Sequence, residues 1–347
     1  MRATLKDVAV RAGVSMQTVS NVMNGRSDHV SDPTYRLVLE ASTALNYRAN
    51  IAARHLRKTS VGVLALVIPD LVNSYFGEVG KVAVDAATEH GYTMLLDYTH
   101  LDRQQELLIV QGLRPHLIDG LILDAQTLVA ADLQAEQRLP IVLLGERVFG
   151  GPCDHIAIDN VAAARVATEH LIGIGRCRIA AIQPRRPTIS GASPMRLQGY
   201  REALQAAGLR EDPALLMYVD TRSPRAFGAR AMRALLALPT PPDAVFCFDD
   251  MLAVGALAAL YQAGVRVPED VAVVGFDDVE DASFTAPPLT SIAPDKIAIG
   301  RLAVELLVGR ITGTRTGPPE EFTPAFSLAV RQSTVGARAG AWRSSAS

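Results

Sequence analysis

Residues 4–25 read TLKDVAVRAGVSMQTVSNVMNG, and this stretch decides the fold of the start of the chain. Its first apolar residues recur with helical spacing, which predicts a helix buried on the side of Leu5, Val8, Ala9 and Ala12. Thr4 can cap the start of this helix, and Gly13 can adopt the left-handed conformation that ends it. A helix of about two turns is therefore expected before a tight turn at Val14.

A second helix is expected to begin at Ser15 and to end at Gly25. Its inward side is expected to hold Val19, Val22 and Met23, and its other side is polar. A third helix is expected to open at Ser31 and Pro33, with a buried side formed by Leu37, Val38, Ala41, Ala44 and Leu45. Two short helices joined by a tight turn, with a third packed on them, predict a helix-turn-helix.

The polar side of the second helix suits the major groove of DNA, where each base pair presents a distinct pattern of donors and acceptors. Gln17 and Asn21 can each form two hydrogen bonds to adenine, and Met16 can contact a thymine methyl group. The shorter polar side chains suit phosphate oxygens, which fix position; they are Ser15, Thr18, Ser20 and Asn24. For an isolated helix, a merely solvated polar face would be the simpler interpretation.

Charge is distributed unevenly along the chain, although the net charge of its 347 residues is only −2. Residues 1–58 hold nine basic and four acidic residues, a net charge of +5, so the remainder carries −7. A basic segment on an acidic body indicates a polyanionic partner at one end of the protein. Chance variation of surface charge is the alternative, and charge alone does not decide between them.

Three successive stretches, TLKDVAVRAGVSMQTVSNVMNG, HVSDPTYRLVLEASTALNYRAN and AARHLR, resemble the lac repressor (LacI/GalR) family of bacterial transcription regulators. The resemblance continues to about residue 335 and outweighs the solvated-face alternative. It implies that Met16, Gln17 and Asn21 contact bases. The family often has an aromatic or polar residue at the first of these positions and arginine at the third, so the outer bases of the operator are expected to differ.

The resemblance also implies a hinge helix and linker at residues 50–60, after a headpiece at 1–49. Asn50 can cap a helix of one or two turns, which is too short to be stable alone in water. Two hinges are expected to fold together in the minor groove, where Leu56 would insert between base pairs. The family's usual proline before Asn50 is Ala49 here. The residues expected to contact DNA are Thr4, Ser15, Met16, Gln17, Thr18, Ser20, Asn21, Asn24, Asn50, Ala53 and Leu56.

Beyond residue 60, apolar strand-like segments such as VGVLALVIP and DVAVVGF alternate with helical segments such as FGEVGKVAVDAATEHG. Near-continuous apolar strands indicate parallel sheets covered on both faces. The expected fold is α/β, with a two-lobed, periplasmic-binding-protein-like effector domain of two doubly wound parallel sheets at 61–335. The small all-α headpiece precedes it, and residues 336–347 are expected to form a disordered tail.

Ligands of doubly wound folds bind at the carboxyl ends of strands, so residues just past those ends are candidates for a cleft between the lobes. Aromatic rings can stack on a sugar, arginine can donate paired hydrogen bonds, and aspartates can accept from hydroxyls. The expected effector-binding residues are Asn73, Tyr75, Phe76, Glu146, Ser190, Arg196, Asp249 and Asp277.

The resemblance implies effector contacts at Arg196 and Asp277. It also shows departures, because Asp249 replaces the family's usual asparagine and Gly145 replaces an aspartate found in several members. Neighbouring charged residues have simpler expected roles. We expect a helix N-cap, a turn residue and a solvated loop charge at Asp250, Asp278 and Arg147, respectively.

Two other classes of protein fit the sequence less well. A periplasmic sugar receptor would share the body, but the N-terminus has no apolar signal segment and the head is basic. An NAD-dependent or nucleotide-hydrolysing enzyme would need a glycine-rich phosphate loop, and the GxG at Gly173–Gly175 ends a helix. No apolar run is long enough to span a bilayer, and three widely spaced cysteines suit a reducing compartment. We expect a cytoplasmic protein that is not an enzyme and needs no cofactor or metal.

One headpiece contacts only a few base pairs, so a homodimer on near-palindromic double-stranded operator DNA is expected. The body is expected to hold the dimer, because the tail shows no heptad pattern. The effector is expected to be a sugar or sugar derivative that controls a repressor of carbohydrate-use genes. The sequence leaves open whether this effector releases the repressor or acts as a co-repressor.

Overall fold

The computed structural model describes residues 3–23, 30–45, 47, 60–111, 117–133, 139–184, 191–219 and 223–336. The chain divides into two compact units, Met1–Val61 and Gly62–Ser347, which we call the N-terminal unit and the C-terminal unit. Several positions expected to bind DNA or effector lie outside the described residues: Asn24, Asn50, Ala53, Leu56 and Ser190. So does the stretch expected to be a tail, from residue 337 onward.

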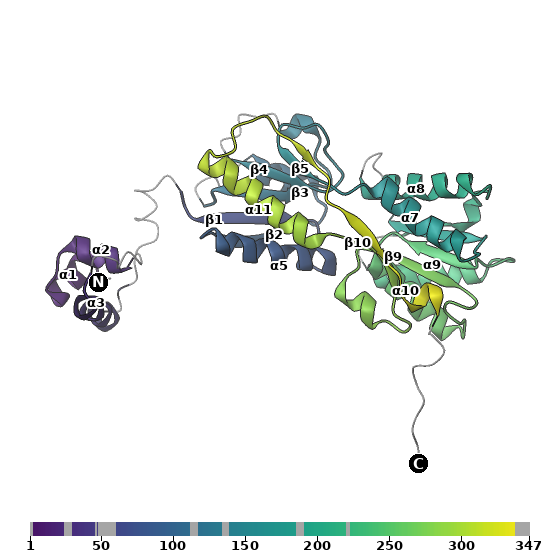
Figure 1. Ribbon diagram of the computed structural model, residues 1–347, viewed down its shortest axis with the longest axis horizontal. Helices are drawn as coiled ribbons and strands as arrows, with labels where there is room; N and C mark the ends of the chain where they lie inside the picture. The colour runs from purple at the N-terminus through teal and green to yellow at the C-terminus, as the bar shows by residue number, and fades with distance from the viewer. Residues whose placement is uncertain are drawn as a thin grey trace, which may run out of the picture. The chain divides into compact units, whose positions relative to one another are not determined.

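The N-terminal unit consists of α1 (Leu5–Ala12), α2 (Met16–Met23) and α3 (Asp32–Ala44), which appear together in Figure 1. Thr4 and Asp7 form a reciprocal capping box at the start of α1, and Gly13 ends it with φ 63°. The small core contains Val8, Ala9, Val19, Val22, Val38 and Ala41. The predicted helix-turn-helix is therefore confirmed.

The predicted buried side of α3 was partly wrong. Leu37 is 51% exposed and Ala44 is also exposed, whereas Val38 and Ala41 are buried and Leu45 is half-buried. Two short helices cover only a narrow stripe of α3, centred on Val38 and Ala41. Leu37 precedes Val38 by one position, and Ala44 follows Ala41 by three. Both therefore lie at the edge of the stripe.

The first lobe of the C-terminal unit has a six-stranded sheet in the order β11-β5-β4-β3-β1-β2, and all of its pairings are parallel. Its strands are β1 (Val63–Ile68), β2 (Thr93–Tyr98), β3 (Gly120–Asp124), β4 (Ile141–Leu144), β5 (Asp154–Ile156) and β11 (Glu321–Phe322). Its helices are α5 (Ser74–Glu89), α6 (Arg103–Val110), η1 (Ala130–Leu133) and α11 (Lys296–Thr312).

The second lobe has a six-stranded sheet in the order β12-β10-β9-β8-β6-β7, in which the β10–β12 pairing alone is antiparallel. Its strands are β6 (Ile179–Pro184), β7 (Leu216–Val219), β8 (Ala244–Cys247), β9 (Ala272–Phe276), β10 (Thr290–Pro294) and β12 (Phe326–Ala329). Its helices are α7 (Asn160–Gly173), α8 (Ala192–Ala206), η2 (Pro213–Leu215), α9 (Pro224–Leu236), α10 (Asp250–Gln262), η3 (Glu280–Phe284) and α12 (Gln332–Val335).

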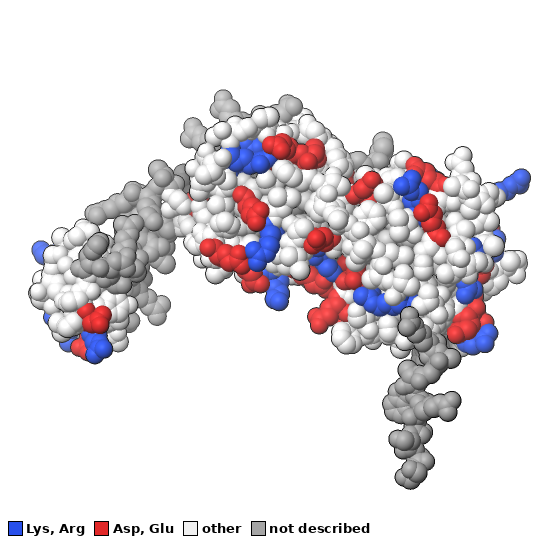
Figure 2. Space-filling view, in the orientation of Figure 1, with Lys and Arg blue, Asp and Glu red and all other residues white. Residues whose placement is uncertain are grey.

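This arrangement confirms the predicted α/β fold with two doubly wound sheets. The chain crosses between the lobes after β5, after β10 and after β11, as Figure 1 shows for the yellow segment that continues into β12. Acidic and basic side chains are interspersed over the face of the C-terminal unit seen in Figure 2. Among the described residues, no helix combines the length and the apolar character needed to cross a membrane.

In the second lobe, the helices α9 and α10 pack closely against each other. A Cβ atom at Gly228 on α9 would lie 2.2 Å from the main-chain oxygen of Leu252 on α10. A Cβ atom at Gly255 on α10 would lie 2.0 Å from the main-chain oxygen of Arg225. Only glycine permits this close approach. The two glycines therefore allow α10, whose first residues lie at the cleft, to pack directly against α9.

Candidate DNA-binding helix and interlobe cleft

The outer face of α2 presents side chains suited to base edges. Met16 is 54% exposed and Gln17 is exposed beside it. The Gln17 Nε2 donates a hydrogen bond to Asn21 Oδ1 at 3.1 Å, so the two amides lie one turn apart on the same face. This geometry brings together the three side chains expected to contact bases.

Hydroxyl groups near the helix starts have local partners. Ser15 Oγ accepts a hydrogen bond from the Thr18 main-chain nitrogen at 3.1 Å and lies 2.9 Å from Thr18 Oγ1. Thr4 Oγ1 donates to Asp7 Oδ2 at 2.7 Å, which helps to hold the pKa of this carboxyl below its usual value. These residues therefore stabilise the helix starts that position the outer face of α2.

A cleft of about 1140 Å³, including its open mouth, lies between the two lobes of the C-terminal unit. Residues from both sheets line it at the carboxyl ends of their strands, as expected for doubly wound folds. It brings together all the expected effector-binding residues that the structure describes: Asn73, Tyr75, Phe76, Glu146, Arg196, Asp249 and Asp277.

The start of α5 forms the aromatic wall of the cleft. Asn73 caps this helix, because its side-chain oxygen accepts a hydrogen bond from the Tyr75 main-chain nitrogen at 3.0 Å. The Tyr75 and Phe76 rings pack edge to face with centroids 5.3 Å apart. Burial and the nearby carboxylates, with Asp277 first among them, raise the pKa of Tyr75 well above its usual value. The hydroxyl therefore stays protonated and can donate to a ligand.

A chain of hydrogen bonds crosses the cleft from lobe to lobe. Arg196 on α8 donates from Nε to Asn160 Oδ1 at 2.7 Å, and Asn160 donates from Nδ2 to Glu146 Oε1 at 2.7 Å. Arg196 Nη1 also donates to the main-chain oxygen of Phe248, and its Nη2 lies 3.9 Å from Asp277 Oδ1. The fully buried Asn160 thus orients a charged residue of each lobe toward the cleft.

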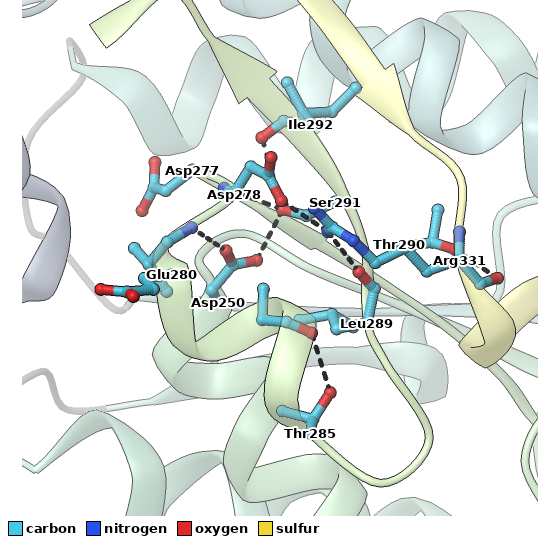
Figure 3. Close-up of polar contacts among 12 residues, drawn as sticks. Asp250, Asp277, Asp278, Glu280, Thr285, Leu289, Thr290, Ser291, Ile292 and Arg331 are labelled. Carbon is cyan, nitrogen blue, oxygen red and sulfur yellow. Dashed lines mark hydrogen bonds and ion pairs between the residues drawn. The ribbon is translucent and has the colours of Figure 1, made fainter.

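Asp277 lies on a loop with unusual backbone geometry. Asp277 and Asp278 follow β9 with φ 108° and 47°, values that side-chain-bearing residues rarely adopt. Burial raises the pKa of the Asp277 carboxyl well above its usual value, although the Arg196 guanidinium opposes that shift. Arg331 Nη1 donates to Asp278 Oδ1 at 2.5 Å from the other side of the loop. Figure 3 shows the loop with Asp277 and Asp278 beside Asp250 and Ser291.

The expectation that Asp250 caps α10 was wrong, because Asp249 is the N-cap and accepts from the Leu252 main-chain nitrogen at 2.7 Å. The fully buried Asp250 instead accepts from Ser291 Oγ at 2.7 Å and from the Val279 main-chain nitrogen at 2.9 Å (Figure 3). Burial raises the pKa of Asp250 to about 7.

Space for the Asp250 carboxylate depends on a glycine in β9. A Cβ atom at Gly275 would lie 2.1 Å from Asp250 Oδ1. The Asp250 carboxyl group therefore packs against Gly275 and accepts a hydrogen bond from the loop after β9. The preceding residue, Asp249, caps α10 and also lines the cleft.

Arg147 was wrongly expected to be a solvated charge. It lines the cleft, is half-buried, and donates from Nε to the main-chain oxygen of Leu128 at 3.0 Å. Beside it lie two cleft residues that were not predicted from the sequence, Asp124 and Gln126. Asp124 ends the apolar segment LIDGLILD, so the rule of strand carboxyl ends could have identified it.

Two further residues that support the site gave no sequence signal. Asn160 begins a helical segment and looked like an ordinary helix start. Glu106 is fully buried on α6, and its carboxylate accepts from the main-chain nitrogens of Gln126, Thr127 and Leu128 at 2.9, 2.9 and 3.1 Å. Its role is visible only once the fold has brought α6 beside the loop after β3.

The described ranges contain no group of three or more His, Cys, Asp or Glu side chains placed to hold a metal ion. The cleft itself presents aromatic rings, the Arg196 guanidinium and the carboxyl groups of Asp124, Glu146, Asp249 and Asp277 among its lining residues. This set of groups suits a ligand rich in hydroxyls.

Both units of the chain match known protein families. Residues 4–50 match the model of bacterial regulatory proteins of the lacI family, and residues 168–334 match a periplasmic binding protein-like domain. The ribose operon repressor of Escherichia coli K12 is 36% identical over 313 residues, covering 89% of this chain and 93% of that protein. The transcriptional repressor CytR of the same strain is 33% identical over 317 residues, covering 91% and 92%.

Solved structures give the same picture. A complex of the transcriptional regulator CelR with cellobiose aligns with a TM-score of 0.68 and 35% identity, over 96% of this chain and all of that chain. The lac repressor dimer bound to operator and an anti-inducer aligns with a TM-score of 0.79 and 27% identity, over 96% and 99%. Both alignments extend over nearly the full length of each chain.

Proposed function

Because this chain belongs to the lacI family of bacterial regulatory proteins, we propose that it represses carbohydrate-use genes as a homodimer on a near-palindromic operator. In this proposal, residues 1–49 bind the major groove, 50–60 act as the hinge, and 61–335 bind a sugar or sugar derivative and a second subunit. The protein acts in the cytoplasm and catalyses no reaction. The observation that carries the proposal is the interlobe cleft.

The cleft favours a sugar because its groups match a ring with several hydroxyls. The Tyr75 and Phe76 rings offer an apolar wall, and the Arg196 guanidinium is held in place by Asn160. The carboxylates of Glu146 and Asp277 can each accept hydrogen bonds from hydroxyl groups on either side of the cleft. Relatives named for ribose and cellobiose support the same class of ligand.

An exposed apolar edge supports a homodimer formed through the first lobe. The strand β2 lies at the end of its sheet and exposes Leu95 and Leu96, with relative exposures of 46% and 53%. Leu108 on α6 and Leu117 extend the same apolar surface. Edge strands and large apolar patches of this kind are usually covered in the functional protein. A second copy of the chain would cover this one and would bring two headpieces to two half-sites.

A DNA-binding assay on two forms of the protein tests the proposal that it is a DNA-binding regulator. Gel shifts of the full chain and of a form without residues 1–58 should show specific DNA binding by the full chain alone. A thermal-shift screen of both forms against D-ribose, cellobiose and other sugars should find the same stabilising sugar, because a ligand specific for the native state raises its melting temperature. Sugar binding without DNA binding by either form would instead favour a sugar receptor.

A further inference from the structure

Two charged side chains hold the loop that carries Asp277, Glu78 of the first lobe and Lys296 at the crossing from β10 into α11. Glu78 on α5 accepts a hydrogen bond through Oε1 from the Glu280 main-chain nitrogen at 2.8 Å. Lys296, the first residue of α11, donates from Nζ to the main-chain oxygens of Asp277 and Asp278 at 2.9 and 2.6 Å. Its Nζ also lies 2.5 Å from Glu78 Oε2, so all these contacts form one network.

The environment of this network makes it more than a surface ion pair. The side chains of Lys296 and Glu78 are only 16% and 30% exposed, so solvent screens their charges weakly. The ammonium has three acceptors within hydrogen-bond distance, one for each of its N–H groups. Two of these acceptors belong to the residues with positive φ, a conformation that persists only where the surroundings hold it.

Residues of the second lobe also form hydrogen bonds with the same loop. Asp250 accepts from the Val279 main-chain nitrogen at 2.9 Å, and Ser291 Oγ accepts from the Asp278 main-chain nitrogen at 3.1 Å. The loop thus has one set of hydrogen bonds to each lobe. Glu78 belongs to the first lobe and Lys296 begins α11 directly after β10, so the set formed by Glu78 and Lys296 lies where the chain crosses between the lobes.

We propose that Glu78 and Lys296 are positioning residues that hold the Asp277 loop in its ligand-binding conformation and couple effector binding to the arrangement of the lobes. This inference rests on the proposed function for its effector. A ligand at Asp277 and a movement of the lobes act on the same hydrogen bonds, so each changes the free energy of the other.

The chain supplies a matched control on the same two helices. Arg301 on α11 forms a bidentate ion pair with Glu89 on α5, at 2.8 and 3.0 Å. The two side chains are 46% and 56% exposed, and the pair links the helices at the surface of the first lobe. Breaking this pair removes an α5–α11 contact of similar chemistry and leaves the Asp277 loop untouched.

Hydrogen exchange of the full chain tests the positioning role without any ligand. Lys296→Met and Glu78→Ala should accelerate exchange of the main-chain amides at residues 278–280 at least about fivefold, because the first removes the ammonium donors and the second removes the acceptor of the Glu280 N–H. Lys296→Arg should restore part of the protection, and Arg301→Met and Glu89→Gln should match the wild type. Should Lys296→Met fail to fold, the partly exposed Glu78→Ala still decides. Unchanged exchange in well-folded Glu78→Ala would overturn the proposal.

The coupling role is tested with the sugar that most stabilises the wild type among D-ribose, cellobiose and the rest of the panel. The measured quantity is the ratio of operator affinities with and without saturating sugar. Lys296→Met and Glu78→Ala should move this ratio at least about fivefold toward one, whereas the Arg301 and Glu89 variants should keep it. A wild-type ratio in both loop variants would overturn the coupling. If no sugar binds the wild type, the proposed effector fails, and the exchange experiment still decides the positioning role.

Discussion

The guanidinium carbon of Arg196 lies 3.4 Å from the centroid of the Phe276 ring, directly over its face. The same guanidinium donates to Asn160 and to the main-chain oxygen of Phe248, so both its plane and its direction are fixed. A planar cation held in this way is ready to form hydrogen bonds to a ligand without losing further side-chain freedom. The stacking and the two hydrogen bonds therefore fix the orientation of the Arg196 guanidinium.

Replacing Arg196 by lysine should abolish the response to sugar while operator binding is kept. Lysine loses the stacking on Phe276 and the planar donors, so we expect sugar affinity to fall about a hundredfold, with Arg196→Ala at least as severe. Isothermal titration with the stabilising sugar measures the change, and gel shifts measure operator binding. Arg230, whose guanidinium lies 4.4 Å from the Phe227 ring, supplies the control Arg230→Lys, which should leave sugar affinity unchanged. Wild-type sugar affinity in Arg196→Lys would remove Arg196 from the site.

Asp250 should make the C-terminal unit less stable as pH rises. The folded pKa of Asp250 is raised to about 7 from an ordinary value of 3.8, so between these values the native state binds a proton that the unfolded chain lacks. The contribution to the unfolding free energy therefore falls as pH rises from about 4 to 7, by at most about 1.4 kcal/mol per pH unit. Asp250→Asn should remove that slope.

Denaturant titrations at pH 5, 6 and 7 measure this effect. The control is Asp270→Asn, because the ion pair with Arg266 lowers the pKa of Asp270 to about 2 and places its titration below this range. Equal slopes in the wild type and in Asp250→Asn would show that Asp250 does not titrate there.

Glu106 should be one of the most stabilising polar residues of the first lobe. Its carboxylate accepts hydrogen bonds from three main-chain nitrogens and from Thr127 Oγ1, all within one loop. Glu106→Ala leaves those donors buried without an acceptor, so we expect a loss of about 3 kcal/mol in the free energy of unfolding. The exposed Glu169, 3.9 Å from Arg165, gives the control Glu169→Gln with an expected change below about 0.5 kcal/mol. A loss below about 1 kcal/mol for Glu106→Ala would contradict this assignment.

Gln17→Ala should weaken binding to the operator and leave binding to random DNA almost unchanged. The exposed amide of Gln17, held near Asn21, is placed to form two hydrogen bonds with one base. Its removal should cost about 1–3 kcal/mol on operator DNA and almost nothing on random DNA at the same salt concentration. Competition titrations with both DNAs check this, and an equal loss on both would mean that Gln17 contacts only the backbone.

Much of this molecule could be predicted from local sequence. Apolar strands such as β1 and β3 are continuous in sequence, and the rule of strand carboxyl ends located seven residues that line the cleft. The short strand β5 was not predicted because its buried polar residues depend on distant partners. Asp154 pairs with Arg310, and His155 contacts Glu321. Their burial becomes favourable only after the chain has returned to the first lobe.

The same dependence on distant residues explains the errors at the cleft. The choice between Asp249 and Asp250 as the helix cap depends on the space left by Gly275, which lies in β9, beyond the helix that these aspartates begin. Asn160 acquires its role from Glu146 and Arg196, which come from different lobes. Local propensity carries no information about such contacts, so the structure was needed to find them.

In vitro selection from a random duplex library with the full chain tests the central claim most directly, because the selection itself identifies the operator. We predict that repeated selection enriches one near-palindromic motif, with half-sites about one helical turn apart, and that the stabilising sugar changes the recovery of that motif. Recovery of sequences indistinguishable from the starting library, across low and moderate salt and with or without sugar, would contradict the account.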